Sequence, residues 1–324
     1  MLMVRTLMYA SLMLAWSATL SAQILDVRDL NTEQIGRFDR ARTVVLLTAG
    51  ILEEHGPYLP SYSDGYQSEF IVTRVADAIA ARSGWTVLRF PEIPLGAFPA
   101  SYVGGKYVFP GSYPIRMTTL RAVFMDLATD LGEAGFKWVF VLTMHGAPTH
   151  NQALDQAAQY FNDTYGGRMV HVTGLTSVVG AVPPDLFTNE QRVAEGFSIH
   201  ADADEHSCLL FLRPDLVAPG IRSAPAVVSR DFAELVATAQ KPGWTGYFGT
   251  PAIATPEAGR RAMHAIAQAA IGLVLNVLDG GSDQGPRVAH RPTSDPAFRG
   301  VIKAALEHER QIERKQAKWL AKQR

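Results

Sequence analysis

The regular alternation of short apolar runs with segments of helical periodicity is what most constrains the fold of this chain. Apolar runs of strand length recur, and longer segments between them carry apolar residues every three or four positions. This alternation is typical of parallel strands joined by helices that cover both faces of a sheet. We therefore predict an α/β fold, a three-layer α/β/α sandwich with a mostly parallel central sheet. The predicted strands are 44–47, 85–90, 137–143 and 168–173, and the predicted helices are 68–81, 117–134, 149–161, 205–212 and 258–278.

The composition is that of an ordinary globular protein. The 324 residues are 47% hydrophobic and 19% charged, with a formal net charge of −1, which argues against a nucleic-acid partner. A chain of this length fits one large α/β domain or two small ones. The single cysteine, Cys208, excludes an intrachain disulfide, and its apolar neighbours predict a buried, inert thiol.

Residues 1–22 have the pattern of a signal peptide. Arg5 precedes an apolar stretch from Thr6 to Leu20, and small residues follow up to Ala22. The stretch is short for a membrane span and has no stop-transfer flank. We expect cleavage after Ala22, a periplasmic or secreted protein, and no stable membrane insertion once the leader is removed. An uncleaved membrane anchor is the alternative.

The C-terminal part, residues 281–324, reads as a linker followed by a charged helix. Gly and Pro are frequent between residues 280 and 292, and the helix is expected from Asp295 to Arg324. Glutamates interrupt its positive charge, so a basic arm for nucleic acid or membrane is not expected. We interpret the helix as solvated or as a contact between subunits.

A group of metal-ligand residues follows the first of these predicted strands. Glu53, His55 and Asp64 are expected on one loop at the carboxyl end of strand 44–47, and open α/β sheets place their ligand sites at that end. Carboxylates and imidazole suit a divalent metal, and both oxygens of Asp64 are available to bridge a pair of ions. A chance occurrence of Glu-x-His is the alternative.

Two further segments carry residues of the same kind. His145 follows strand 137–143, so a parallel sheet would bring it beside the Glu53 loop. His200 lies just before helix 205–212, and Glu205 is its first residue. Glu205 is a candidate ligand, and His200 is a candidate proton-transfer group. The alternative for His145 is a loop histidine without a ligand role. The alternative for Glu205 is an acidic residue that complements the positive end of a helix.

At these positions the chain resembles the creatininase family of metal-dependent amidohydrolases, over residues 40 to 275. The family pattern contains Glu-x-His-Gly-Pro-His-Leu-Pro with an aspartate nine residues past the histidine, and then Phe-Pro-Gly-Thr, Asn-Gly-His-Gly-Gly-Asn and His-Ala-Gly-Glu-x-Glu-Thr-Ser. This chain has them in the same order, as Glu53-Glu-His55-Gly-Pro-Tyr-Leu-Pro60 with Asp64, Phe109-Pro-Gly-Ser112, Thr143-Met-His145-Gly-Ala-Pro148 and His200-Ala-Asp-Ala-Asp-Glu205-His-Ser207.

The resemblance implies that residues 23–280 form a metal-dependent amidohydrolase domain with two divalent ions, zinc, manganese or iron. Glu53, Asp64 and His145 would hold one ion, and His55, Asp64 and Glu205 the other. A hydroxide shared by the ions would attack the amide, and His200 would pass a proton to the leaving nitrogen. A homohexamer is also implied.

The chain departs from the family where the substrate is expected to bind. Pro148 replaces an asparagine, Ala147 a glutamate of creatininase proper, Lys106 a histidine and His206 a threonine. Lys106, Ser112 and His206 are the candidate substrate contacts, and Lys106 is either an anion partner or a solvated lysine. We therefore expect hydrolysis of a non-peptide C–N bond in a small amide or lactam, with creatinine itself a poor substrate. The alternatives are an exported binding protein that has lost catalysis and a metallopeptidase-like hydrolase of short peptides.

Overall fold

A five-stranded parallel sheet forms the centre of the molecule. The computed structural model describes residues 23–290 and 296–323, so the predicted signal peptide lies outside the described residues. The strand order is β1-β3-β2-β4-β5, and each neighbouring pair is parallel. The strands are β1 (Gln23–Asp26), β2 (Thr43–Thr48), β3 (Thr86–Arg89), β4 (Trp138–Leu142) and β5 (Arg168–His171).

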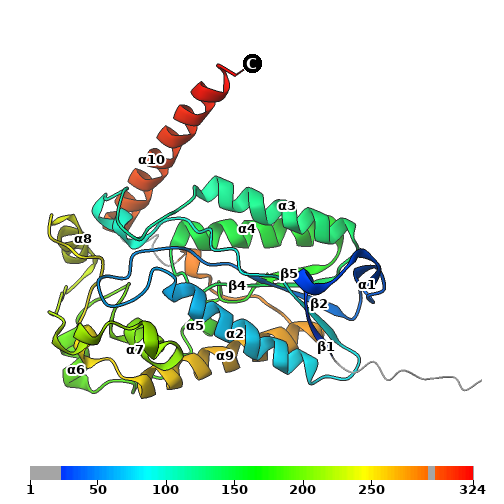
Figure 1. Ribbon diagram of the computed structural model, residues 1–324, viewed down its shortest axis with the longest axis horizontal. Coiled ribbons are helices and arrows are strands. Elements are labelled where there is room, and N and C mark those ends of the chain that lie inside the picture. Colours follow the sequence, from blue (N-terminus) through cyan, green and yellow to red (C-terminus); the bar gives the residue numbers. More distant parts are fainter. Residues whose placement is uncertain (1–22, 291–295, 324) are drawn as a thin grey trace, which may run out of the picture.

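Helices cover both faces of the sheet, which confirms the predicted α/β/α sandwich (Figure 1). Every residue of β2 is buried, because successive side chains of a strand point to opposite faces and both faces are covered. Val44 and Leu46 enter one core, and Val45 and Leu47 enter the other. The first core contains side chains of α2 (Ser63–Ala80), α7 (Ala203–Leu212) and α9 (Pro256–Leu278), and the second those of α3 (Met117–Glu133) and α4 (Pro148–Tyr165).

Helix α9 is long and apolar enough to cross a membrane by length and composition. In this fold it packs on α2 and α7, and Met263, Ile266 and Val274 belong to the core. It therefore serves here as a core helix.

The predicted elements are all present, but several short ones were not predicted. The described residues also contain β1 and the helices α1 (Thr32–Gly36), α5 (Thr176–Val179), α6 (Asn189–Glu195) and α8 (Phe232–Gln240). The 3-10 turns are 27–29, 100–104, 214–216, 219–223 and 251–253.

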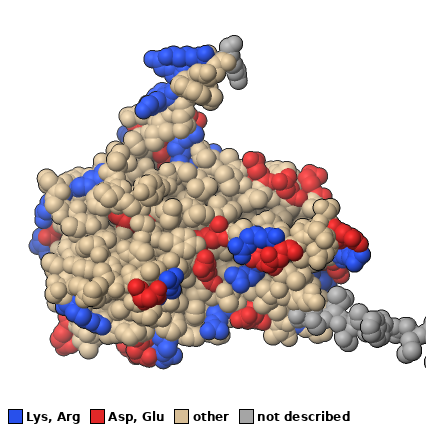
Figure 2. All heavy atoms as spheres, in the orientation of Figure 1, with Lys and Arg blue, Asp and Glu red and all other residues tan. Residues whose placement is uncertain are grey.

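The C-terminal segment is attached to the body more closely than a linker would be. Val288 N–H donates to the Gly174 carbonyl (2.8 Å), and Arg287 donates to Asp155 (3.2 Å). Helix α10 (Pro296–Leu320) then packs its first half against α8 and the 100–104 turn. Its second half projects from the body (Figure 1), and Figure 2 shows lysine and arginine side chains gathered near its end.

Candidate metal centre

The predicted metal-ligand residues meet at the carboxyl end of the sheet. Strands β2 and β4 are direct neighbours, so the segments that follow them, carrying Glu53 and His145, leave the sheet side by side. Glu205 comes from the first turn of α7, and His200 from the segment just before that helix. The expected convergence of distant segments is therefore present in the fold.

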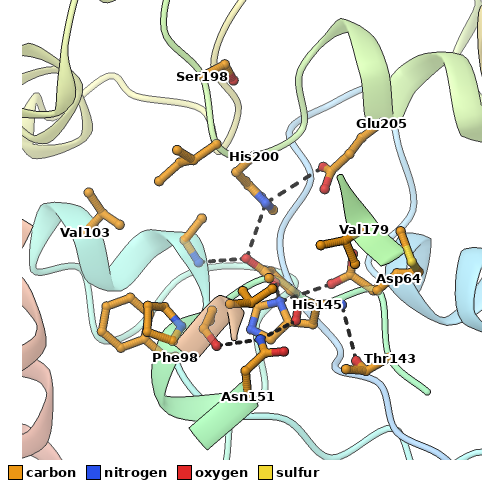
Figure 3. Close-up of a pocket in the computed structure, with 18 of the residues that line it drawn as sticks. Asp64, Phe98, Val103, Thr143, His145, Asn151, Val179, Ser198, His200 and Glu205 are labelled. Carbon is orange, nitrogen blue, oxygen red and sulfur yellow. Dashed lines mark hydrogen bonds and ion pairs between the residues drawn. The ribbon is translucent and has the colours of Figure 1, made fainter. Parts of the chain in front are cut away.

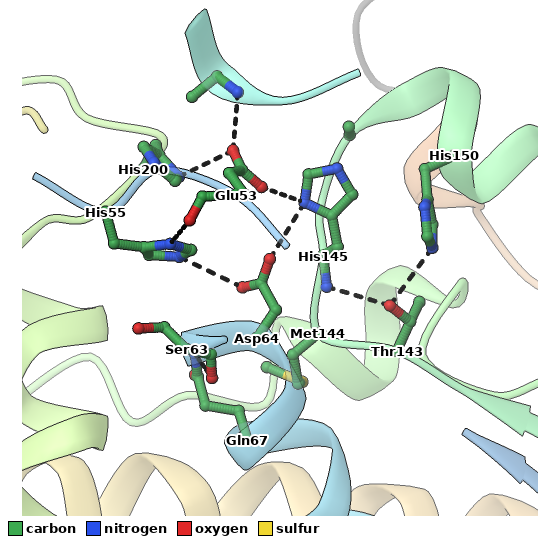
Figure 4. Close-up of polar contacts among 12 residues, drawn as sticks. Glu53, His55, Ser63, Asp64, Gln67, Thr143, Met144, His145, His150 and His200 are labelled. Carbon is green, nitrogen blue, oxygen red and sulfur yellow. Dashed lines mark hydrogen bonds and ion pairs between the residues drawn. The ribbon is translucent and has the colours of Figure 1, made fainter. Parts of the chain in front are cut away.

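One group of ligands consists of Glu53, Asp64 and His145, all buried (Figure 4). His145 Nδ1 lies 2.8 Å from Glu53 Oε2 and 3.2 Å from Asp64 Oδ2. One ligand atom from each residue lies within 4.8 Å of the others, which is close enough to share a cation.

The second group lies on the other side of Asp64. His55 Nε2 is 3.6 Å from Asp64 Oδ1 and 3.7 Å from Glu205 Oε2. The two oxygens of Asp64 thus face different groups, Oδ2 toward His145 and Oδ1 toward His55. His200 also belongs to this region, because it, His55 and Glu205 each offer a ligand atom within 4.8 Å of the others, and its ring centroid lies 4.5 Å from that of His55.

Asp64 lies on a helix and not on the expected loop. Helix α2 begins at Ser63, five residues before the predicted start at Ser68, so Asp64 is in its first turn. Partial positive charge at a helix N-terminus stabilises a carboxylate there. The position is also more rigid than a loop, because α2 packs on α9 and the sheet.

Backbone carbonyls fix the orientation of all three imidazoles. His145 Nε2–H donates to the Ala97 carbonyl (3.0 Å) and His55 Nδ1–H to the Glu53 carbonyl (3.1 Å), which directs His145 Nδ1 and His55 Nε2 at the carboxylates. His200 Nε2–H donates to the Glu54 carbonyl (2.5 Å), which leaves Nδ1 facing the centre. Contacts of this kind select the tautomer and aim of metal-binding histidines.

Two residues beside the centre have left-handed backbone conformations that non-glycine residues rarely adopt. Phe98 has φ of 63° and Ala201 has φ of 45°. Ala201 N–H donates to Glu205 Oε2 (2.5 Å), and the turn after Phe98 brings Ala100 N–H to Glu53 Oε1 (2.7 Å). Strain of this kind collects at functional sites because the surrounding structure must hold it there.

The unsatisfied polar atoms of the centre fit divalent cations. Glu53 Oε2, His55 Nε2 and Asp64 Oδ2 are buried and make no hydrogen bond of suitable geometry within the described part of the chain. Buried polar atoms seldom lack partners, and here Glu53 Oε2 and Asp64 Oδ2 belong to the first group and His55 Nε2 to the second. Carboxylate oxygens with imidazole nitrogens are suitable ligands for zinc, manganese or iron.

Burial and the close approach of charged groups shift the pKa values of the carboxyl groups in the centre. Burial opposes ionisation of Asp64, but the adjacent imidazoles of His145 and His55 hold its pKa well below the usual range. Burial raises the pKa of Glu205 to about 8, against the opposing effect of His55. The carboxyl groups therefore depend on positive charge within the centre to remain ionised.

A cavity of about 590 Å³ opens onto the centre (Figure 3). Glu53, Asp64, His145, His200 and Glu205 lie in its wall, so a small molecule in the cavity reaches both groups of ligands. Cavities of several hundred Å³ are typical of small-molecule sites.

The three candidate substrate contacts do not line this cavity. Lys106 Nζ donates to the carbonyls of Ala239 and Lys241, so the structure gives it a local partner in place of a ligand anion. Ser112 Oγ donates to the Glu54 carboxyl group and accepts from Glu54 N–H (3.0 Å).

His206 is buried behind Glu205 and donates from Nδ1 to the Asp202 carbonyl (2.9 Å). Like Lys106 and Ser112, it hydrogen-bonds to neighbouring backbone and so stabilises the loops around the centre. Substrate contact by these three residues stays a prediction.

Sequence reasoning missed the residues that hold the His145 loop. Asn151 Nδ2 donates to the His145 carbonyl (3.0 Å), and Thr143 Oγ1 accepts from His145 N–H (3.2 Å). It also missed Glu54, whose carbonyl orients His200 and which forms a third group with Glu53 and His200. Only the closeness of Glu54 to Glu53 and of Thr143 to His145 in the chain hinted at these roles.

Comparisons with known proteins agree with this architecture. A family model described as Creatininase: Creatinine amidohydrolase matches residues 28–274. A search among curated proteins finds no match.

Solved creatininase structures have a similar fold. A structure from Bacteroides fragilis NCTC 9343 assigned as a creatinine amidohydrolase is 22% identical, covers 78% of this chain and 96% of its own, and has a TM-score of 0.57. A manganese form of creatininase is 20% identical over 78% of this chain and 98% of its own, with a TM-score of 0.59. A mutant creatininase of the Zn-Zn type is 21% identical with the same coverage and a TM-score of 0.58.

Proposed function

Because the chain belongs to the creatininase family and is a metal-dependent amidohydrolase, we propose that it hydrolyses the C–N bond of a small amide or lactam with two divalent ions as cofactors. The observation that carries this proposal is the geometry of Asp64, whose two oxygens face two separate groups of ligands. Glu53 and His145 would complete one site, and His55 and Glu205 the other.

Divalent ions held by these residues would lower the pKa of a water and polarise the amide carbonyl. The first two donor sets each combine carboxylate oxygen with imidazole nitrogen, and zinc, manganese and iron all accept such ligands.

We infer that His200 moves the proton. Burial lowers the pKa of His200 to about 4 although the charge of Glu53 raises it, so Nδ1 is unprotonated at neutral pH and able to accept a proton. In hydrolysis the water oxygen bonds to the acyl carbon as the C–N bond breaks, and Nδ1 takes a proton from water and gives it to the leaving nitrogen. Nδ1 lies 3.4 Å from Glu53 Oε1, so it faces the ligands at which that water would be bound.

The walls of the cavity would exclude bulk water from this chemistry. His145 and His200 are each at most 6% exposed, and apolar side chains such as Phe98 and Met144 surround them. Electrostatic interactions are stronger in such surroundings than in water.

Metal analysis combined with a substrate panel tests the proposal. Protein purified without added metal should contain about two divalent ions per chain and hydrolyse a member of a panel of lactams, simple amides and short peptides. Creatinine should be a poor member, because the loops around Phe109 and His145 depart from the family pattern. Turnover of creatinine as the best substrate would refute this choice of substrate, and a metal-loaded protein inactive on the whole panel would favour a binding protein.

We also propose, from the sequence pattern and the family resemblance alone, that the protein is exported and assembles into a homo-oligomer, a hexamer in the simplest case. Light scattering on the purified protein tests the assembly. A monomer at micromolar concentration would contradict it.

A further inference from the structure

The cavity is strongly apolar away from the metal centre. Phe98, Val103 and Val179 line it, and Figure 3 shows Phe98 and Val103 across the cavity from Glu205. Its volume of about 590 Å³ is in the range that accommodates ligands of drug size. A small polar substrate would leave much of this apolar surface uncovered.

Three phenylalanines form one part of the wall. The ring centroids of Phe232 and Phe298 are 4.4 Å apart, and those of Phe197 and Phe232 are 6.4 Å apart with nearly perpendicular planes. Such arrangements are favourable for aromatic rings and offer both a face and an edge to a further ring.

Part of this wall is exposed just before His200. Phe197 is 38% and Ile199 is 42% exposed, although both line the cavity. Covering such surface with an apolar group removes it from water, which is favourable. Both side chains line the same cavity as His200, so a ligand bound there can cover them.

The described part of the cavity wall offers no cationic side chain of lysine or arginine to an anionic substituent. Within the described residues, the acidic and histidine side chains that line it are all members of the metal centre, and neither lysine nor arginine contributes to it. Lys106 is held by the carbonyls of Ala239 and Lys241. A carboxylate beside the phenylalanines would be desolvated without an opposite charge to stabilise it.

Two of the lining residues lie beyond the part of the chain that matches the family. The match ends at residue 274, whereas Val288 and Phe298 belong to the C-terminal segment. Phe298 is on α10, which packs with Phe232 and Trp244 in a separate apolar cluster. The wall therefore includes an element outside the part of the chain that the family model matches.

We propose that the substrate is an amide or lactam carrying an uncharged, apolar group about the size of a phenyl ring, and that α10 is a specificity element for that group. This inference rests on the proposed function, since the apolar group must be attached to the amide that is cleaved. The phenylalanines at 197, 232 and 298 bind it, while the metal centre binds the amide.

Three related amides test the preference. With metal-loaded enzyme, kcat/KM for phenylacetamide should exceed that for acetamide by on the order of 10- to 100-fold, the range expected for burial of one aromatic ring. Adding a charge, in 4-carboxyphenylacetamide, should lower kcat/KM by about tenfold or more, because the group is desolvated unpaired. Equal values for acetamide and phenylacetamide would overturn the inference.

Substitutions of the wall phenylalanines test whether they cause the preference for phenylacetamide over acetamide. Phe298→Ala should reduce the ratio of kcat/KM for phenylacetamide to that for acetamide by about 3- to 10-fold, because one of three rings is removed. Phe197→Ala provides the same test at a partly exposed position if Phe298→Ala does not fold. Trp319→Ala, on the same helix but 61% exposed and outside the cavity, should leave the ratio unchanged. A ratio unaffected by either phenylalanine substitution would refute the role of the wall.

A binding measurement separates this inference from the proposed function. Titration calorimetry with phenylacetamide should give binding that Phe298→Ala or Phe197→Ala weakens, whether or not the amide is cleaved. Such binding without hydrolysis of any amide would support the role of the phenylalanines in binding and refute the proposed amide hydrolysis. Hydrolysis with no preference for the phenyl group would support the proposed amide hydrolysis and refute the role of the phenylalanines in substrate selection.

Discussion

The carboxyl group of Glu309 should make the stability of the protein depend on pH in a way that one substitution removes. Glu309 lies on α10, is only 6% exposed, and its Oε2 accepts from Met117 N–H (2.9 Å) at the start of α3. The N-cap residue of α3, Arg116, makes no side-chain capping bond, so Glu309 supplies the cap from another helix.

The size of the effect follows from the acidity of this group. Burial raises the pKa of Glu309 from 4.5 to about 7, although the Met117 hydrogen bond and the charge of Arg116 lower it. The folded state therefore holds the proton more tightly than the unfolded chain does. Protonated Glu309 therefore adds on the order of 3 kcal/mol to the free energy of unfolding. This contribution is complete below about pH 4.5 and is lost as the pH rises toward 7.

Glu309→Gln keeps an oxygen acceptor for Met117 N–H but cannot ionise. We expect the variant to match the wild type near pH 4.5 and to exceed it at pH 8 by on the order of 1–3 kcal/mol, measured by urea unfolding at several pH values. Glu313→Gln is the control, because this carboxylate is 60% exposed and paired with Arg116 at 3.5 Å. A Glu309→Gln variant less stable than the wild type at pH 8 would show that the ionised carboxylate is the stabilising form.

Three further predictions concern the centre and the N-terminus. Asp64→Ala should lose both ions in elemental analysis, because each of its oxygens faces one group of ligands, and a single ion that survives would exclude a shared ligand. His200→Ala should keep the ions but lower kcat by on the order of 10²- to 10⁴-fold, the usual contribution of proton transfer, and an unchanged kcat would remove His200 from the reaction. In a suitable bacterial host, N-terminal sequencing of the exported protein should begin near Gln23, and a cytosolic protein that begins at Met1 would contradict export.

The sequence predicted the layers of the fold because those depend on local periodicity. The spacing of apolar residues within each run determines whether it becomes a strand or a helix, and the long helices and central strands followed this rule. Parallel strands end at one edge of a sheet, so residues placed after β2 and β4 were expected to meet there.

The start of α2 was missed because its first turn has little apolar periodicity. Ser63, Asp64 and Gly65 are weak helix formers, and glycine there favours a loop in sequence-based reasoning. The structure explains the glycine by packing, since a Cβ at Gly65 would come within 2.3 Å of the Tyr62 ring. A packing contact with Tyr62, only three residues earlier, therefore accounts for a glycine that apolar periodicity does not reveal.

The role of α10 could not be predicted for a related reason. Its pattern of alternating charges is typical of a solvated helix, and its projecting half fits that description. The buried position of Glu309 and the place of Phe298 in the cavity wall depend on how the helix docks beside α8. Nothing in the local sequence determines that docking.

The two parts of the site therefore differ in how tightly the fold constrains them. Glu53 and His145 lie in the segments that follow two central strands, and Asp64 lies in the first turn of a packed helix. A small displacement there would separate ligand atoms that are close enough to share a cation. Val288 and Phe298 instead come from the C-terminal segment and contribute apolar area, which tolerates changes of shape better than a ligand set does. Chemistry can thus stay the same among proteins of this fold while substrate preference changes, because Phe298, which we propose as a specificity residue, lies on an element that the metal centre does not require.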